Sequence, residues 1–277
     1  MTPLISILVR ACNVNRFLPA ALQSIARQDY LRWEALILDD ASDEDVEGVA
    51  APYLRADRRF RFVRNPIRLG RPGNLNRGLA LACGEYIAVL DGDDIWRDIT
   101  TLTKLATALS TRPEASLVTA SAVEVDERGK DIRYFSNGYS SDRAIRERLL
   151  IENTIAHNAV CYRKKDVLAT GGYNETLRYT EDYELWLRLG LQGKLFKFSD
   201  YLASYRIHGA NIGIRKRHNQ IIEECAVVWR YRYAYPHFWL ALMNRLLAFI
   251  SLCIPKNTRR VLARALRYHA VRMSLID

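Results

Sequence analysis

Three groups of carboxylates stand where apolar or helical segments begin or end. Asp91-Gly92-Asp93-Asp94 follows the apolar run 87–90, Asp39-Asp40 follows the run 33–38, and Glu181-Asp182 begins a segment with helical spacing. Three carboxylates within four positions repel one another, and hard oxygen donors in this arrangement suit Mn²⁺ or Mg²⁺. A helix N-cap or a solvated turn explains a short D-x-D pattern equally well, because aspartate favours both.

The elements that must position these carboxylates alternate along the first hundred residues. The spacing of apolar residues predicts strands at 4–9, 33–38, 59–63 and 86–90, with helices at 18–28, 73–82 and 101–109. This alternation is typical of βαβ units and a mostly parallel sheet, whose ligands bind at the carboxyl ends of the strands. The clusters at 39–40 and 91–94 both fall at such ends, so we expect them to lie close together.

The second half of the chain is expected to continue this α/β pattern. We predict strands at 115–125 and 159–163, a loop at 136–143, a turn at 171–174, a helix at 181–191, and only helical spacing beyond residue 206. No internal repeat or low-complexity tract interrupts the sequence.

Several motifs in a fixed order carry a family resemblance across residues 3 to 212. Residues 3–13 follow the pattern P-x-x-S-I-I-x-P-x-Y-N, residues 39–43 follow D-D-G-S-x-D, and 69–70 and 76–78 follow two N-x-G-type motifs. Residues 82–94 follow A-x-G-E-Y-I-x-x-L-D-x-D-D, 171–175 follow G-G-F-D-E, 181–188 follow E-D-x-x-L-x-x-R, and 205–208 follow Y-R-x-H. With these motifs in this order, the chain resembles the inverting family 2 glycosyltransferases of the GT-A fold.

The resemblance implies an α/β fold of the GT-A type, with a Rossmann-like, mostly parallel central sheet flanked by helices. Residues 1–212 would form the catalytic domain, with a nucleotide-binding half at 1–95 and an acceptor-binding half at 96–212, and 213–277 would form a basic helical appendage. The implied enzyme is an inverting hexosyl- or hexosaminyltransferase. It would move a sugar from a nucleoside-diphosphate sugar to a hydroxyl of a saccharide or lipid-linked acceptor, in bacterial surface polysaccharide synthesis.

Residue roles follow from the matched motifs. Asp182 would be the general base that takes the proton of the attacking hydroxyl, and Asp93, with Asp91 and His208, would hold Mn²⁺ or Mg²⁺ against the diphosphate. The remaining substrate-binding residues implied are Asp39, Asp40, Asp91, Arg71, Asn76, Glu181 and His157. Capping of a turn by Asp39, helix-dipole stabilisation by Asp182 and a structural hydrogen bond from His208 are the competing explanations.

Some positions depart from the family pattern. Arg10 and Cys12 stand where the family usually has Pro and Tyr, so the preference among uridine, guanosine and thymidine carriers stays open. Leu75 occupies the place of the motif arginine, and either Arg71 or Arg77 is the candidate to supply the missing positive charge.

The net charge of +10 is concentrated in the C-terminal region. Residues 215–277 hold 12 of the 41 Lys and Arg and 3 of the 31 Asp and Glu. The rest of the chain therefore has 29 basic and 28 acidic residues and is nearly neutral. The apolar run 238–254 is at the short limit for a bilayer span and contains Asn244 and Arg245. We expect the appendage to contact an anionic membrane surface, to pack on the body, or to form a homodimer.

The composition also indicates where the chain works and what it excludes. No secretory signal opens the sequence, so we expect a cytoplasmic protein, in the cytosol or on the inner face of the plasma membrane. The five cysteines do not have paired spacing, so we expect them to be buried thiols. Nucleic acid is not an expected partner, because basic and aromatic residues do not interleave over the body. A sugar nucleotidylyltransferase would need a Gly-rich loop in place of residues 11–15. A protein that binds nucleotide sugars without catalysis is the other alternative.

Overall fold

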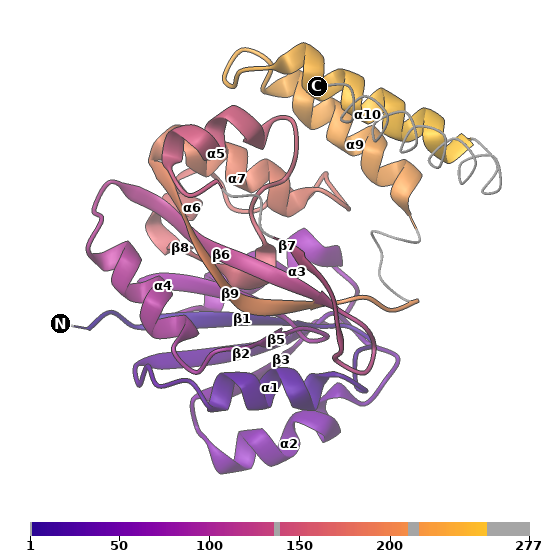
Figure 1. Cartoon of the computed structure of the whole chain (residues 1–277). Coiled ribbons are helices and arrows are strands. Elements are labelled where there is room, and N and C mark those ends of the chain that lie inside the picture. Colours follow the sequence, from indigo (N-terminus) through magenta and orange to yellow (C-terminus); the bar gives the residue numbers. More distant parts are fainter. Residues whose placement is uncertain (1, 136–138, 210–215, 254–277) are drawn as a thin grey trace.

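A single curled sheet of nine strands runs through the molecule and carries helices on both faces (Figure 1). The computed structural model describes residues 2–135, 139–209 and 216–253. The strands are β1 (Ile5–Ala11), β2 (Trp33–Asp39), β3 (Phe60–Arg64), β4 (Tyr86–Asp91), β5 (Ile95–Trp96), β6 (Ala115–Val125), β7 (Asp131–Phe135), β8 (Val160–Arg163) and β9 (Lys194–Arg206). The helices are α1 (Leu18–Ala26), α2 (Val46–Ala56), α3 (Gly70–Leu81), α4 (Thr101–Ser110), α5 (Asp142–Leu149), α6 (Lys164–Ala169), α7 (Glu181–Gln192), α9 (Arg217–Arg230) and α10 (Phe238–Cys253).

The strand order is β3-β2-β1-β4-β8-β6-β9-β5, with β7 paired to β6. The first four strands of this order are parallel, as are β6 and β9, whereas β8, β5 and β7 pair antiparallel to their neighbours. The predicted α/β class with a mostly parallel sheet is therefore confirmed. The sheet is continuous from the N-terminal strands to β9.

Alternating residues of the central strands divide the core into two layers. In β1, Ile5, Ile7 and Val9 belong to the layer beneath α1, α2 and α4, whereas Leu8 belongs to the layer beneath α3, α5 and α7. This alternation follows from the period-2 geometry of a strand buried on both faces. A Cβ on Gly78 would lie 2.5 Å from Cδ1 of Leu38, so α3 can approach β2 this closely only with glycine there.

Several elements differ from the expectations. The sequence did not lead us to α2, β7 or β9. Of the loop predicted at 136–143, residues 136–138 lie outside the described residues, and its end is helical, because Ser141 caps α5, which begins at Asp142. The prediction of buried thiols is wrong for three cysteines, since Cys12, Cys83 and Cys253 are exposed, whereas Cys161 is buried.

Helices α9 and α10 form a hairpin that packs against α7. Tyr231 donates from its hydroxyl to Glu184 at 2.7 Å, and Tyr235 donates to the carbonyl of Leu187 at 2.8 Å. Arg245 is buried between the two helices beside Glu224. In the part of the chain that the structure describes, no helix is both long and apolar enough to span a membrane. The arginine-bearing segment after residue 253 lies outside the described residues.

Candidate active site

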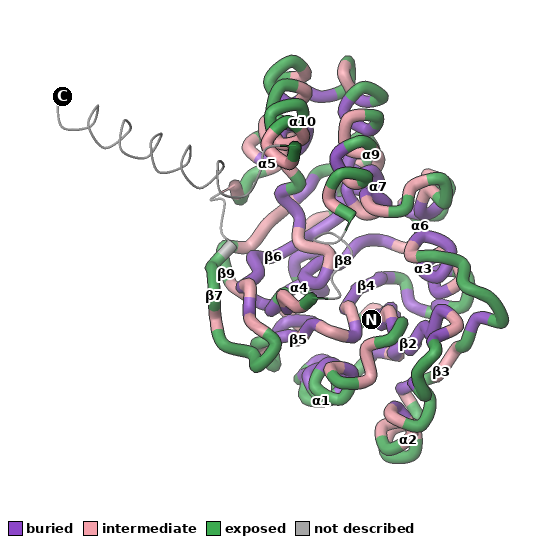
Figure 2. The backbone as a smooth tube through the Cα atoms, turned by 90° about the vertical axis from the view of Figure 1, so that its right-hand side faces the viewer, coloured by how far each residue is buried: buried purple, intermediate pink, exposed green. Residues whose placement is uncertain are grey.

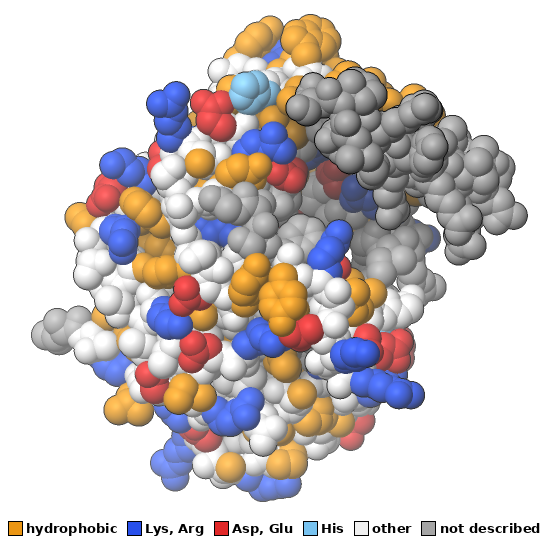
Figure 3. Space-filling view, in the orientation of Figure 1, with side chains coloured by type: hydrophobic (Ala, Val, Ile, Leu, Met, Phe, Trp, Pro, Cys, Tyr) orange, Lys and Arg blue, Asp and Glu red, His pale blue; other side chains and the backbone are white. Residues whose placement is uncertain are grey.

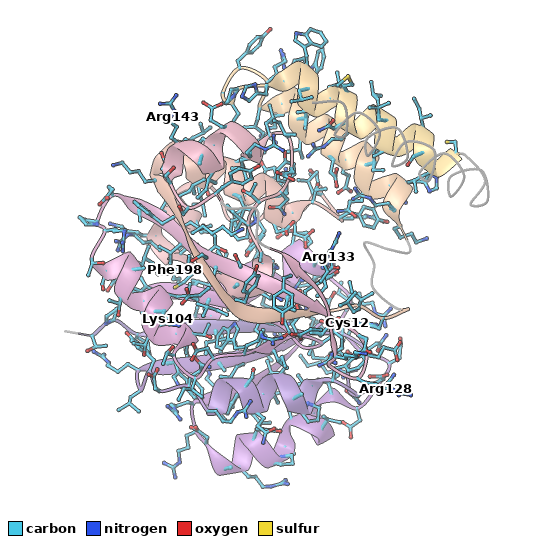
Figure 4. All side chains as sticks on the ribbon, viewed as in Figure 1. Cys12, Lys104, Arg128, Arg133, Arg143 and Phe198 are labelled. Atoms are coloured by element: carbon cyan, nitrogen blue, oxygen red, sulfur yellow. The ribbon has the colours of Figure 1, made fainter. Side chains whose placement is uncertain are left out.

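The candidate site lies at the edge where β1, β2 and β4 end. The parallel register pairs Arg10 of β1 with Asp91 of β4 and Ala11 with Asp39 of β2. Cys12, which directly follows β1, marks this edge in Figure 4. The structure thus brings the two aspartate clusters to neighbouring strand ends, as their positions in the sequence predict.

Arg10 joins the end of β4 to the start of α7. Its Nε and Nη2 each lie 2.5 Å from an oxygen of Asp91, and its Nη1 lies 3.2 Å from Oε1 of Glu181. Glu181 is buried, and Oε2 has no hydrogen-bond partner within the described residues. A planar guanidinium is suited to hold two carboxylates in fixed positions. Arg10 therefore fixes α7 relative to the metal-binding candidates.

The Arg10–Asp91 pair also sets the charge state of both groups. Burial disfavours either charge alone, but the attraction and hydrogen bonds of the partner outweigh it. The pKa of Asp91 is consequently well below its usual range, and that of Arg10 is raised. Asp91 is a carboxylate under all ordinary conditions, with its charge offset by Arg10.

Asp91, Asp93 and Asp94 lie together, with one oxygen of each within 4.8 Å of the others. Asp93 is 20% exposed, and its Oδ2 lies 2.9 Å from Nε2 of His208. Within the described residues, neither Asp93 nor Asp94 forms an ion pair with Lys or Arg. The carboxylate oxygens and the imidazole nitrogen form a donor set that fits Mn²⁺ or Mg²⁺. Of this set, Asp91 is the member that Arg10 engages.

Asp94 lies behind Asp93 and His208, and both of its carboxylate oxygens accept hydrogen bonds from the protein. One oxygen accepts the backbone N–H of Arg206 at 2.8 Å, and the other accepts Nδ2 of Asn158 at 2.9 Å. Burial, followed by the charges of Asp93 and Asp91, raises its pKa well above the ordinary value. Asp94 thereby ties β9 and the segment at Asn158 to the acidic cluster.

Asp182 is the partly exposed carboxylate at the start of α7. Its Oδ1 accepts the N–H of Tyr183 at 2.7 Å, and Nδ2 of Asn153 lies 3.5 Å from Oδ2. Burial, and then the negative charge of Glu181, raise the pKa of Asp182 to about 6, against the smaller opposing effects of Arg71 and Arg10. A carboxylate with a pKa near 6 is suited to accept a proton at neutral pH.

Arg71 and Arg77 differ in what they contact. Arg71 is 35% exposed, with Nε 3.4 Å from Oε1 of Glu181, and its charge acts on Asp91 and Asp182. Arg77 instead donates to the carbonyl of Arg64 and to Asn65. Of the two candidates, only Arg71 faces the carboxylates of the site.

Asp39 and Asp40 lie at the end of β2, in neighbouring but different environments. Asp39 is buried, accepts the N–H of Ser42 at 3.0 Å, and pairs with Arg64 at 2.7 Å. Asp40 accepts Asn65 and the N–H groups of Leu69 and Gly70. Both side chains thus shape the loops around them, and their contact with a substrate stays a prediction.

Asn76 holds the turn at 171–174. Its Oδ1 accepts the N–H of Tyr173 at 2.7 Å, and its Nδ2 donates to the Tyr173 carbonyl and to Glu175. Gly171 and Gly172 have φ of 90° and 76°, a region that favours glycine. The predicted turn is present, and the amide of Asn76 is committed to it.

His157 lies deeper, between Tyr173 and Trp186. Its Nε2 is 3.2 Å from the Tyr173 hydroxyl, and its ring packs at 5.8 Å from that of Trp186. Burial, followed by the charge of Arg10, lowers the pKa of His157 to about 3. His157 is therefore neutral, and its predicted contact with an acceptor stays a prediction.

Arg10, Asn158 and Arg206 belong to the site, although the sequence did not lead us to assign them to it. For Arg10 a signal exists, because it ends β1 beside the strand that ends in Asp91. Arg206 lies within the Y-R-x-H motif at 205–208, whereas the spacing gives no signal for Asn158. The contacts of both residues to the acidic cluster depend on β8 and β9 joining the sheet.

Comparisons with known proteins agree with this arrangement. Residues 6–168 match the family model described as Glycosyl transferase family 2. An uncharacterized glycosyltransferase of Methanocaldococcus jannaschii is 26% identical over 208 residues, which cover 74% of this chain and 71% of the relative. A putative colanic acid biosynthesis glycosyl transferase of Escherichia coli is 30% identical over 192 residues, covering 68% of this chain and 66% of the relative.

The solved structures show the same fold. The mannosyltransferase PcManGT from Pyrobaculum calidifontis, solved in complex with GDP-Man and Mn²⁺, has a TM-score of 0.69 at 15% identity and covers 98% of this chain and 81% of its own. The fold and the acidic strand ends define a GT-A glycosyltransferase. The chain belongs to glycosyltransferase family 2, as the family match over more than half of its length shows.

Proposed function

We propose that this glycosyltransferase is an inverting enzyme that moves a sugar from a nucleoside-diphosphate sugar to a hydroxyl of a saccharide or lipid-linked acceptor. The observation that carries the proposal is the Arg10 bridge, which holds Glu181, and with it Asp182, next to the acidic cluster at the end of β4. One side of the site then offers a base, and the other offers the groups that would bind a diphosphate.

In the proposed reaction, Asp182 accepts the proton of the acceptor hydroxyl as that oxygen bonds to the anomeric carbon. The bond from this carbon to the diphosphate oxygen breaks, and the nucleoside diphosphate leaves with its electron pair. Attack from the side opposite the leaving group inverts the anomeric centre. Mn²⁺ or Mg²⁺, held by Asp93 and His208 with Asp91 beside them, would neutralise negative charge on the leaving diphosphate.

Other residues of the site would orient the substrates. Arg71 has the charge and exposure to meet a phosphate. Asp39 and Asp40, at the adjacent strand end, would contact the nucleotide base or ribose, and Asn76 lies in the same donor half. Glu181 and His157 would lie on the acceptor side. This division corresponds to a donor half at 1–95, an acceptor half at 96–212, and an appendage from 213 onward.

The named relatives support the substrate classes. PcManGT was solved with a nucleotide sugar and Mn²⁺, and the Escherichia coli relative is named for biosynthesis of a polysaccharide. We therefore place the reaction in bacterial surface polysaccharide synthesis, on the cytoplasmic side of the plasma membrane. Homodimerisation through the C-terminal helices is tested separately, by light scattering of the wild-type chain.

The test is a screen of nucleotide sugars for donor binding and for turnover, with Asp93→Ala and Asp182→Asn. Asp93→Ala is expected to lose metal-dependent donor binding. Asp182→Asn is expected to keep donor binding and to lose turnover at least a hundredfold, the usual range for a general base. Glu85→Gln, an exposed carboxylate at the opposite end of β4, is the matched control and should change neither.

Three results would overturn the proposal. Full turnover in Asp182→Asn would remove Asp182 as the base. Formation of a nucleotide sugar from a sugar 1-phosphate and a nucleoside triphosphate, with release of pyrophosphate, would identify a nucleotidylyltransferase instead. Donor binding without any turnover across an acceptor panel would favour a non-catalytic binding protein.

A further inference from the structure

The outer face of the α9–α10 hairpin exposes large apolar side chains on a helix that is otherwise packed. On α10, Trp239 is 75% exposed and Leu247 is 56% exposed, whereas Ala241 and Arg245 on the opposite face are buried. The exposed side chains occupy one helical stripe: Trp239, Leu240, Met243, Leu246, Leu247 and Ile250. Arg245 is the one charged residue in α10, so the stripe contains no charge. Figure 2 shows exposed segments along α10, and Figure 3 shows apolar side chains gathered at this end of the molecule.

Aromatic residues extend the stripe onto the turn between the two helices. Trp229 is 55% exposed and Tyr233 is 89% exposed. The rings of Trp229 and Phe238 lie 5.6 Å apart, and Phe238 contacts Trp239 at 4.8 Å, so the aromatic end is continuous with the α10 stripe. Tryptophan and tyrosine are the residues enriched where a protein meets the head-group region of a bilayer.

Charge around this face is positive. Arg232 lies over the rings of Trp229 and Tyr233 at 4.8 and 4.4 Å, and Arg230 is 62% exposed. The two acidic residues of the hairpin are engaged internally. Glu223 accepts backbone N–H groups of Arg178 and Tyr179, and Glu224 pairs with Arg217 and Arg245. Residues 254–277, which lie outside the described residues, contain six Lys or Arg and one Asp in the sequence.

We propose that the α9–α10 face, defined by Trp229, Tyr233 and the α10 stripe, docks the enzyme on a bilayer surface that contains anionic lipids. An uncharged apolar stripe bordered by Trp, Tyr and Arg is the chemistry of a helix lying in the interface plane. A second copy would bring the same arginines of both chains together, because an isologous interface pairs a patch with itself. The excess of positive charge therefore favours an anionic surface over a dimer. The face lies outside the candidate active site, so the inference does not depend on the chemistry proposed there.

The experiment is co-sedimentation of the full chain with vesicles of phosphatidylcholine alone or with a quarter phosphatidylglycerol, at low and high salt. Wild type is expected to bind the anionic vesicles and to bind less at high salt, since an electrostatic attraction is screened. The variant Trp239→Gln/Leu246→Gln/Ile250→Gln is expected to bind at least tenfold more weakly. Leu31→Gln/Ile132→Gln/Leu168→Gln removes exposed apolar side chains elsewhere and should bind as wild type does.

A second readout uses tryptophan fluorescence. Trp33, Trp96 and Trp186 are buried, so Trp229 and Trp239 are the ones available to lipid. Brominated lipid is expected to quench them in wild type, and Trp239→Phe is expected to lose most of the quenching. Circular dichroism distinguishes a variant that fails to fold from one that loses membrane contact. Donor hydrolysis without acceptor distinguishes a failure of the proposed chemistry from loss of membrane contact.

Three outcomes would overturn the inference. Wild type could fail to bind anionic vesicles. The α10 triple variant could bind as tightly as wild type. Alternatively, light scattering could show a wild-type dimer that the triple variant converts to a monomer, which would make a second copy the occupant of this face.

Discussion

The pKa of Asp182 leads to a sharp prediction about pH. Since its pKa is about 6 in the folded protein and a general base must be ionised, kcat/KM is expected to fall below pH 6. At pH 5 about one molecule in ten retains the carboxylate, so activity should be about tenfold lower than its plateau at pH 7.5 or above. The measurement is a pH–rate profile of the wild-type enzyme with saturating metal. The rates are corrected for donor binding at each pH.

The same shift has a consequence for stability that needs no substrate. A carboxyl whose pKa is raised from 3.8 to about 6 by folding favours the folded state below pH 4, and this contribution is lost as the pH rises through 6. The full difference corresponds to about 3 kcal/mol, and partial exposure of Asp182 reduces it. Asp182→Asn should therefore gain stability relative to wild type between pH 4 and pH 8, measured by urea unfolding. An acid limb centred near pH 4, together with a pH-independent stability difference, would refute the reasoning.

Three further predictions concern the residues that build the site. Arg10→Gln leaves Asp91 buried without its partner and is expected to lower the free energy of unfolding, measured in urea, by about 3–5 kcal/mol. Arg61→Gln breaks an exposed pair with Glu34 and is expected to lower it by under about 1 kcal/mol. Equal losses in the two variants would contradict the role assigned to Arg10. Gly172→Ala places a Cβ 2.7 Å from Oδ1 of Asn76 and should destabilise the fold more than Gly171→Ala, which meets nothing within 4 Å and adds only the backbone cost of about 1–2 kcal/mol. Mn²⁺ at about a hundred times its dissociation constant is expected to stabilise the wild-type fold by about 2.7 kcal/mol in a thermal-shift titration. The stability of Asp93→Asn is expected to stay unchanged. Equal stabilisation of both proteins would show that the ion does not bind at Asp93.

The parallel part of the sheet could be predicted from sequence because β1, β2 and β4 are mostly apolar and buried and have distinct ends. Parallel neighbours end at one edge, so Asp39 and Asp91 could be placed together without knowing the fold in detail. The antiparallel and edge strands carry a weaker signal. In β9 only part of the residues are buried, and its pairing with β6 shifts register more than once, so neither alternation nor a continuous apolar run identifies it.

Arg10 shows the limit of reasoning from motifs. In the sequence it is a departure from the family pattern near the base-binding edge, and its place close to the end of β1 points to Asp91, but nothing there indicates Glu181. In the fold, the parallel register places it directly beside Asp91, and α7 brings Glu181 within 3.2 Å. Long-range contacts of this kind depend on how α7 packs on the sheet, which no local spacing encodes.

The contacts of Arg10 also indicate which aspartates of the D-x-D pattern are available to bind a metal ion. A carboxylate whose two oxygens are both held by a guanidinium is a weaker ligand for a cation, because the guanidinium occupies one lone pair of each oxygen and its positive charge repels the ion. Asp94 is equally engaged, through Arg206 and Asn158. Of the three aspartates, Asp93 alone presents a carboxylate that is partly exposed and contacts only His208 within the described residues. Asp93 is therefore the main metal-ligand candidate, because its neighbours are held by other groups. Arg10→Gln is expected to strengthen Mn²⁺ binding in the fraction that remains folded, because Asp91 is then free to bind the ion together with Asp93.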